Sequence, residues 1–325
     1  MKFPNQAFRL LARAACGALL AGAVLAPAFA QDRYPSQPVK IVVPYPAGGS
    51  TDLIARQLSE QLGKELGQTV VVDNRPGGGT NIGAEAVVRA KPDGYTLLFA
   101  NNSQVLNPNF GPIPSFELSA LEPISLVSRV AFVVAANPKT PFNTGAELLA
   151  AAKAAPGKLT VSSAQLDLYV EMLNRKAGIS LLHVPYKGGA PATTDAISGQ
   201  VNMVFALTPV LLPHIQGGRL KALAVTTGKR LNALPDVPTL VELGVDYDFA
   251  IWYGLMAPAG TPKAIVDRLA AATQKIMSSP DMMARIRSGG SEPVWSKPEE
   301  FQAELKRESA FWQQTARTMP HLVQK

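Results

Sequence analysis

The sequence predicts an α/β protein whose two lobes each contain a parallel sheet. Strand-like and helix-like segments alternate from residue 39 onward, which is the pattern of parallel strands joined by helices. Two apolar, β-forming runs, residues 124–136 and 249–257, are suited to crossing between two lobes. Hydrophobic residues make up 47% of the chain and charged residues 17%, which describes a folded protein with an ample core.

Two crossings imply that one lobe interrupts the other along the chain. We expect lobe 1 to comprise residues 31–128 and 250–325, and lobe 2 to comprise residues 129–249. A length of 325 residues is compatible with two domains of medium size. Because ligands of open α/β sheets bind beyond the carboxyl ends of the strands, the loops at those ends are the first candidates for a site.

The first thirty residues have the pattern of a signal peptide. Lys2, Arg9 and Arg13 give a positive start, residues 14–25 form an apolar run, and an Ala-Phe-Ala motif ends at Ala30. The apolar run is too short to span a membrane. We therefore expect export to the periplasm, with cleavage near Ala30.

Charge and cysteine content narrow the class of ligand. The only cysteine, Cys16, lies in the removable segment, so the mature chain is expected to contain no disulfide. Removal of that segment lowers the formal net charge from +7 to +4. A modest positive balance without a run of Lys or Arg favours small anionic ligands and gives no indication of nucleic acid binding.

The first predicted βα unit contains the strongest site signal. Residues 39–43 predict a buried strand, Gly48 and Gly49 follow in a short loop, and Ser50 or Thr51 is a candidate N-cap. Glycines allow a ligand close to the backbone, and a helix start offers unpaired N–H groups in a positive field. This arrangement suits a carboxylate. An ordinary strand-to-helix turn is the equally weighted alternative.

The remaining elements follow the same alternation. We expect strands at residues 69–72, 95–100, 159–162, 181–184, 201–206 and 220–226. We expect helices at residues 84–90, 146–155, 208–216 and 261–278, helices that end at 177 and 198, and a last helix from a capping box at 296–299 to about residue 318. Residues 107–123 contain four prolines and are interpreted as loop with room for a short helix.

Four loops at strand ends are rich in glycine or hydroxyl residues, and two fall in each predicted lobe. They are residues 44–51, 76–83, 162–165 and 185–191. Two lobes that face each other with such helix starts predict a cleft for a small acid.

Motifs for other activities are missing from the sequence. There is no GxSxG motif, and the loop at 77–83 fits neither GxGxxG nor GxxxxGK[ST]. His183 and His214 are more than twenty residues apart and have no neighbouring metal-ligand pattern. We expect neither a metal nor a cofactor.

Several motifs together resemble the Bug family (UPF0065), the extracytoplasmic substrate-binding proteins of tripartite tricarboxylate transporters. The motifs are Val43–Gly49 with Asp52, Asn74–Gly77 with Asn81–Ala84, Lys91–Leu98, His183–Ala192, Leu234–Thr239, and Trp252–Leu255 with Ala257–Pro262. The resemblance covers nearly the whole mature chain.

This resemblance implies a type II periplasmic-binding-protein fold that captures an organic acid and delivers it to membrane transporter subunits. It also implies which residues clasp one carboxylate: Ala47, Gly48, Gly49, Ser50, Thr80 and Asn81. We expect a monomer that makes transient contacts with the transporter and does not bind nucleic acid.

The second lobe departs from the family pattern. The loop at residues 162–169 is shorter than in relatives, and Ala206 stands where relatives often place an acid. After the third strand, Asn101, Asn102 and Ser103 replace the usual Thr/Ser-Gly pattern. An amino-acid ligand is disfavoured, because a buried ammonium group needs a charged partner.

Further candidate residues come from the loop positions. Tyr45 and Tyr186 follow prolines on facing loops, where they are equally suited to walling a cleft and to packing. The polar candidates at strand ends are Asn102, Ser103, Ser163 and Gln165. Asp52 is expected to favour the helix dipole rather than to touch an anion.

The sequence therefore predicts a receptor for a di- or tricarboxylate or an aromatic acid that performs no chemistry. One alternative is a periplasmic hydrolase that uses Ser50 or Ser163. A second is a receptor that presents its ligand to a signalling kinase.

Overall fold

A mixed sheet of ten strands organises the described part of the chain. The strand order is β2-β1-β3-β9-β4-β7-β5-β6, and β8 and β10 also pair with β4. The strands are β1 (Val39–Val43), β2 (Val70–Asn74), β3 (Thr96–Asn101), β4 (Leu121–Ala136), β5 (Thr160–Ser163), β6 (Leu182–Pro185), β7 (Met203–Leu207), β8 (Lys221–Val225), β9 (Ala250–Pro258) and β10 (Glu292–Pro293).

The computed structural model describes residues 34–163, 167–186 and 188–323. The predicted signal peptide with its cleavage site, Gln165 and Lys187 lie outside these residues. Residues 37–325 form one unit of contacts, and the fold below is that of this unit.

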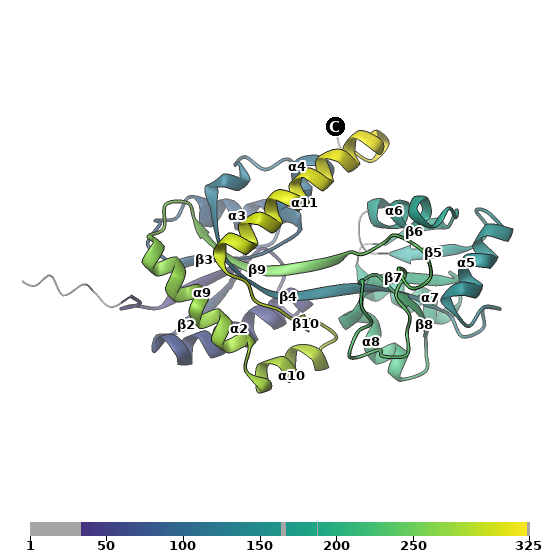
Figure 1. Cartoon of the computed structure of the whole chain (residues 1–325), viewed down its shortest axis with the longest axis horizontal. Coiled ribbons are helices and arrows are strands. Elements are labelled where there is room, and N and C mark those ends of the chain that lie inside the picture. Colours follow the sequence, from purple (N-terminus) through teal and green to yellow (C-terminus); the bar gives the residue numbers. More distant parts are fainter. Residues whose placement is uncertain (1–33, 164–166, 187, 324–325) are drawn as a thin grey trace, which may run out of the picture. The chain divides into compact units, whose positions relative to one another are not determined.

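Helices cover the sheet on both sides of the crossing strands (Figure 1). The helices are α2 (Ser50–Leu66), α3 (Asn81–Val88), α4 (Ser103–Phe110), α5 (Gly145–Ala154), α6 (Asp167–Ala177), α7 (Gly189–Ser198), α8 (Thr208–Gln216), α9 (Lys263–Met277), α10 (Pro280–Ser288) and α11 (Pro298–Thr318). Short 3₁₀ turns lie at η1 (Gly78–Thr80), η2 (Leu118–Ala120) and η3 (Pro320–Leu322).

The strands β4 and β9 connect the two halves of the sheet. They pair antiparallel with each other from Leu121–Pro258 to Ala131–Ala250. β4 then continues into antiparallel pairing with β7 and β8, while β9 also pairs with β3. Figure 1 shows these two strands running side by side from the group around β1–β3 to the group around β5–β8. They are the two crossing runs that the sequence predicts.

Parallel strand pairs occur in each of the two groups, as expected for βαβ units. β1 is parallel to β2 and β3, and β5 is parallel to β6 and β7. The two-lobed α/β prediction is confirmed. The residue boundaries of the lobes remain a prediction.

The short helix allowed for in the proline-rich segment is present as α4 at residues 103–110, with Pro108 inside it, because a short helix loses a single backbone bond to a proline and keeps the rest. Two local predictions were wrong. α2 is capped by Gly49 without a side-chain bond. The last helix begins at Pro298, and the amide of Lys297 donates to Glu300, so the capping position is one residue later than predicted.

Two elements between residues 279 and 295 were missed by the sequence analysis. α10 starts where Ser279 accepts a hydrogen bond from the amide of Met282, with Pro280 at the first helical position. β10 consists of two residues that pair with β4. The sequence signals were a Ser-Pro start and a strand too short to show a period.

An aromatic cluster packs α6 and α11 against β4. Tyr169, Phe132 and Phe249 lie within 6.3 Å of one another by ring centroids, and Trp312 contacts Tyr169 at 6.2 Å and Phe249 at 5.6 Å. Aromatic side chains bury large areas in such contacts. The cluster therefore joins helices of both sequence halves next to the crossing strands.

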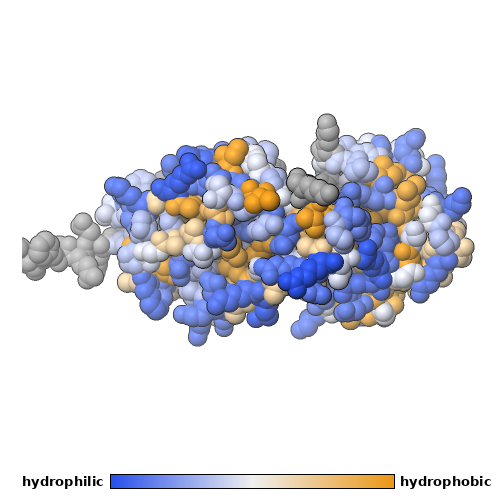
Figure 2. All heavy atoms as spheres, turned by 90° about the horizontal axis from the view of Figure 1, so that it is seen from above, coloured by the Kyte–Doolittle hydropathy of each residue, from blue (hydrophilic) through white to orange (hydrophobic). Residues whose placement is uncertain are grey.

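Hydrophilic residues cover much of the face seen in Figure 2, with hydrophobic residues scattered among them. Scattered apolar residues are normal on a protein surface. Within the described residues, none of the helices combines the length and apolar character that crossing a bilayer requires.

Candidate functional site

A cleft of about 770 Å³ lies where the loops of the two sheet groups meet. Ligand pockets have volumes of about 300–1,000 Å³. The residues that line it are Tyr45 to Thr51, Gly79, Thr80, Asn101, Asn102, Ser103, Leu106, Asn107, Gly111, Pro112, Tyr169, Gly188, Gly189, Ala206, Leu207, Val210, Ile251 and Tyr253. Among these described residues there is no acidic or basic side chain.

Three helix N-termini lie on one side of the cleft. Ser50 is the first residue of α2, Thr80 is the N-cap of α3, and Ser103 is the first residue of α4, and all three line the cleft. The first N–H groups of a helix have no partner within the helix and carry a partial positive charge. The amides of Thr80 and Ser103 already donate to the Gly77 carbonyl and to Asn101 Oδ1. What the three starts share on this wall is therefore the positive field of their helices, which suits an anion.

The loop before α2 is held by a buried carboxylate. Asp52 accepts hydrogen bonds of 2.9 Å from the amide of Gly48, from Arg56 Nε and from Asn74 Nδ2, and Asn74 Nδ2 also donates to the carbonyl of Tyr45. The Gly48 amide is therefore engaged by Asp52. Gly49 and the first two residues of α2 also line the cleft.

The loop before α3 has an unusual backbone. Gly77, Gly78, Gly79 and Thr80 have φ angles of 118°, 57°, 60° and 87°. Thr80 is the only non-glycine residue with positive φ in the described residues, and such strain concentrates at functional sites. Asn107 supports the loop by donating to the carbonyl of Gly79 at 2.6 Å.

Gly83 allows α3 to lie against the first loop. A Cβ atom at this position would come within 2.8 Å of Pro44 Cβ and 2.9 Å of the carbonyl oxygen of Arg75. Such distances are too short for a side chain. The close approach places the starts of α2 and α3 around one cleft.

Tyr45 connects the first loop to the end of β3. Its hydroxyl accepts a hydrogen bond of 2.6 Å from Asn101 Nδ2 and lies 3.2 Å from Ser103 Oγ. Burial raises the pKa of Tyr45, and the hydrogen bonds with Ser103 and Asn101 lower it by less. The phenol therefore stays neutral at ordinary pH.

The opposite wall is less polar. Tyr169 of α6, Ala206 of β7 and Val210 of α8 line it, together with Gly188 and Gly189 at the start of α7. Ala206 is 3% exposed and pairs with Val133 of β4. This wall offers apolar surface and one further helix start.

The structure brings together most of the sequence-predicted site residues. Those that line the cleft are Tyr45, Ala47, Gly48, Gly49, Ser50, Thr80, Asn102 and Ser103. Asn81, Ser163 and Tyr186 are not among the lining residues, and Gln165 lies outside the described residues. Asn81 donates to the carbonyl of Pro112 and braces the loop behind the lining.

Tyr186 points its hydroxyl to Asp195 of α7, to which it donates a hydrogen bond. Its ring packs against the core formed by β4, β7, α7 and α8. Of the two roles considered for Tyr186, the observed contacts are those of packing.

Ser163 belongs to a chain of three polar side chains. Ser163 Oγ lies 2.8 Å from His183 Nε2, and His183 Nδ1 lies 2.8 Å from Asp167 Oδ1. Burial lowers the pKa of His183, and Asp167 acts in the opposite direction. Ser163 is fully buried, whereas the side chain of Asp167 is 62% exposed. These contacts connect β5 and β6 with the start of α6.

The sequence analysis missed the lining residues from helix interiors and from the crossing strand. Asn107, Tyr169, Val210, Ile251 and Tyr253 line the cleft, but none lies in a glycine- or hydroxyl-rich loop. Helical spacing alone makes Tyr169 and Val210 look like core residues. Their exposure to the cleft depends on how α6 and α8 pack.

The sequence matches a known protein family. Residues 54–317 match the family described as "Tripartite tricarboxylate transporter family receptor". That match covers most of the chain. The chain belongs to this receptor family. The chain also has the periplasmic-binding-protein fold of its structural relatives, in accordance with the predicted fold.

Individual relatives of the receptor are similar over almost their full length. Protein BugT of Bordetella pertussis is 35% identical over 94% of this chain and 95% of its own. The structure of Rpa4515 of R. palustris with adipate has a TM-score of 0.78 and 30% identity, with 88% and 98% coverage. MatC of Rhodopseudomonas palustris with bound malate has a TM-score of 0.72 and 26% identity, with 87% and 99% coverage.

Proposed function

We propose that this receptor binds a small carboxylic acid in the cleft and performs no chemistry on it. The observation that carries the proposal is the convergence of the α2, α3 and α4 N-termini on one wall without a charged lining residue in the described part of the chain. Helix starts bind anions through N–H groups and their positive field. A carboxylate held there needs no cationic side chain.

The proposed ligand class is a di- or tricarboxylate or an aromatic acid. Two similar receptors were solved with dicarboxylates, adipate and malate. On the facing wall, Gly188 and Gly189 bring the start of α7 to the cleft beside the ring of Tyr169. The helix start suits a second anionic group, and the ring suits an aromatic body.

The proposed pathway starts with export through the signal peptide and ends at a membrane transporter. We propose that a monomeric receptor closes its two lobes, residues 31–128 with 250–325 and residues 129–249, around the ligand and presents it to transporter subunits. Membership of a transporter receptor family supports this role. A ligand that touches both walls of the cleft stabilises the closed state.

The test is a thermal shift screen of the purified protein with dicarboxylic, tricarboxylic and aromatic acids. An acid that binds only the folded state raises the free energy of unfolding by about 2.7 kcal/mol at a concentration of one hundred times Kd. The melting temperature rises as a consequence. We expect at least one acid of the panel to do so. A panel without any shift at millimolar concentrations contradicts the proposal.

A glycine variant tests the location of the site. Gly49→Val leaves the fold intact, since Gly49 has φ of −78° and a Cβ atom there meets nothing closer than 3.7 Å. Its side chain blocks the start of α2, so ligand binding should be lost. Gly289→Val, at an exposed position outside the cleft lining with a φ of −79° and no atom closer than 3.4 Å to a Cβ atom, is the matched control. Unchanged affinity in Gly49→Val places the ligand elsewhere.

A serine hydrolase is the second candidate function, because Ser163, His183 and Asp167 contact one another in the order of a Ser-His-Asp triad. Ser163 is fully buried and is not a lining residue of the cleft. We expect no turnover of p-nitrophenyl esters and no labelling by a fluorophosphonate. Labelling that disappears in Ser163→Ala supports the hydrolase instead.

A further inference from the structure

Asn102 lines two hollows of the molecule. One is the cleft, and the other is a hollow of about 560 Å³ on the α11 side of the crossing strands, here called the hinge-side hollow. Arg129, Trp252 and Glu308 also line the hinge-side hollow. Asn102 is therefore a residue that the cleft shares with groups lying outside it.

The side chain of Asn102 extends the pairing of β3 with β9. The last main-chain pair of these strands is Asn101 with Tyr253. One position further, Asn102 Oδ1 accepts a hydrogen bond of 2.6 Å from the amide of Trp252. The side-chain carbonyl of Asn102 thus acts as a backbone carbonyl would in a strand that pairs with the crossing strand β9.

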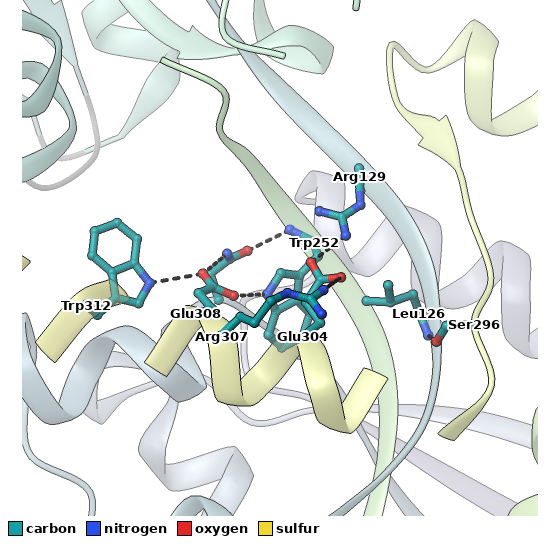
Figure 3. A network of polar contacts seen from close by, with 9 residues as sticks. Leu126, Arg129, Trp252, Ser296, Glu304, Arg307, Glu308 and Trp312 are labelled. Atoms are coloured by element: carbon teal, nitrogen blue, oxygen red, sulfur yellow. Dashed lines mark hydrogen bonds and ion pairs between the residues drawn. The ribbon is translucent and has the colours of Figure 1, made fainter. Parts of the chain in front are cut away.

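Glu308 of α11 holds the other end of the Asn102 amide. Asn102 Nδ2 donates to Glu308 Oε1, and Trp312 Nε1 donates to the same oxygen at 3.0 Å. Trp252 Nε1 donates to Glu308 Oε2. Figure 3 shows the Glu308 carboxylate between the indoles of Trp252 and Trp312. These three hydrogen-bond partners of Glu308 are all N–H donors, so an ionised carboxylate matches them.

An asparagine amide has two orientations, and its neighbours decide between them. At Asn102 the carbonyl faces an N–H donor on β9 and the NH₂ group faces a carboxylate on α11. In the reversed orientation both contacts become repulsive. Glu308 therefore fixes the side chain that lines the cleft and pairs with β9.

We propose that Glu308 is a positioning residue for the cleft: through the amide of Asn102 it sets the ligand affinity and the pairing of β3 with the crossing strand β9. This inference rests on the proposed function for its affinity part. Glu308 does not itself line the cleft.

The surroundings of Glu308 allow its proton to be exchanged through the hinge-side hollow. Burial raises the pKa of Glu308 above the ordinary value of 4.5, the three donors lower it, and Glu304 raises it. The charged groups around the same hollow are Glu304 and Arg307 of α11, Arg129 of β4, and Lys229 and Asp248 of the segment before β9. Protonation of Glu308 removes one acceptor site from its carboxylate. We therefore expect ligand affinity to fall as the pH drops through the titration of Glu308.

The first experiment is calorimetric titration of adipate into the wild type, Glu308→Gln and Glu304→Gln. In Glu308→Gln an NH₂ group replaces one acceptor oxygen and opposes an N–H donor, so we expect adipate to bind about five- to tenfold more weakly. Glu304→Gln, one turn away and paired with Arg129 rather than with Asn102, should stay within about twofold of the wild type. Both variants are checked for an unchanged circular dichroism spectrum.

The second experiment needs no ligand. In the ¹⁵N-labelled wild type, the Asn102 side-chain amide and the indole N–H signals of Trp252 and Trp312 should shift with pH at one common midpoint. The chain has three tryptophans, and Trp295, which is 40% exposed, provides the internal reference that should not follow. In Glu308→Gln the common shift should be lost.

Any of three results overturns the proposal. The first is an Asn102 amide signal that titrates in the same way in Glu308→Gln. The second is wild-type adipate affinity in that variant, and the third is an equal loss of affinity in Glu304→Gln. A wild type that binds neither adipate nor any acid of the thermal panel contradicts the proposed function, while the Asn102 titration still decides whether Glu308 positions this side chain.

Discussion

Asp52 illustrates how a single residue acquires a role that its position in a helix does not reveal. A carboxylate in the first turn of a helix is commonly explained by the dipole. Here it also holds the preceding loop through the Gly48 amide and holds the neighbouring strand end through Asn74. The loop that contributes to the cleft is thus fixed from behind by an anion, which is itself paired with Arg56.

The Asp52 contacts predict a pH-dependent contribution to stability. Burial by itself raises the pKa of Asp52, but hydrogen bonds from Arg56, Gly48 and Asn74 outweigh it and bring the pKa below 3.8. Because the pKa in the folded state is below the unfolded value, the stabilisation is present above pH 3.8 and is lost as the pH falls through the lowered pKa.

We therefore expect Asp52→Asn to lower the melting temperature near neutral pH and to differ less from the wild type in strong acid. Thermal melts of both proteins across the acid range test this, with Asp236→Asn at an exposed position as the control. A difference between wild type and Asp52→Asn that is constant with pH contradicts the ionic role.

At the scale of elements, α11 is the helix that holds the crossing strands. Glu308 contacts Trp252 of β9, and Glu304 forms an ion pair with Arg129 of β4. Trp252 and Arg129 are partners in the β4–β9 pairing, so each of the two α11 acids contacts one residue of that pair. Before α11 begins, Ser296 accepts a hydrogen bond from the Leu126 amide, next to an irregularity of β4.

Gly254 of β9 allows α11 to pack closely on the crossing strands. A Cβ atom there would come within 2.7 Å of the Phe301 ring and 3.0 Å of the Ser125 carbonyl oxygen. We expect Gly254→Ala to destabilise the protein by about 1–3 kcal/mol through overpacking. Urea unfolding measures this, and Gly289→Ala, where the nearest atom is 3.4 Å away, is the control. Equal stability of the two variants contradicts tight packing at Gly254.

At the scale of the whole molecule, the cleft has walls from both groups of strands, and β4 and β9 connect the groups. A ligand that contacts both walls favours the state in which they are close. We expect a binding acid from the thermal panel to decrease the radius of gyration measured by small-angle X-ray scattering. Gly49→Val with the same acid is the control. An identical scattering curve with and without saturating ligand contradicts closure.

Much of the fold and part of the site could be predicted from the local sequence. The β-branched run at 39–43, the glycine loops and the helical spacing after them identify β1, α2 and α3 because these signals act between residues close in the chain. The same loops supply Gly49, Ser50 and Thr80 to the cleft. The crossing strands were visible as long apolar runs, since both are buried along almost their whole length.

What the sequence by itself determined is the alternation of strands and helices, the two crossings and the helix starts at the glycine loops. Tertiary structure alone decided which side chains face the cleft, as at Tyr169 and Tyr253, and which hold others in place, as Asp52 and Glu308 do. The physical reason is that hydrophobic period and turn chemistry are local properties. The partner of a buried polar group is set by the packing of segments such as α11 and β3, which lie some two hundred residues apart.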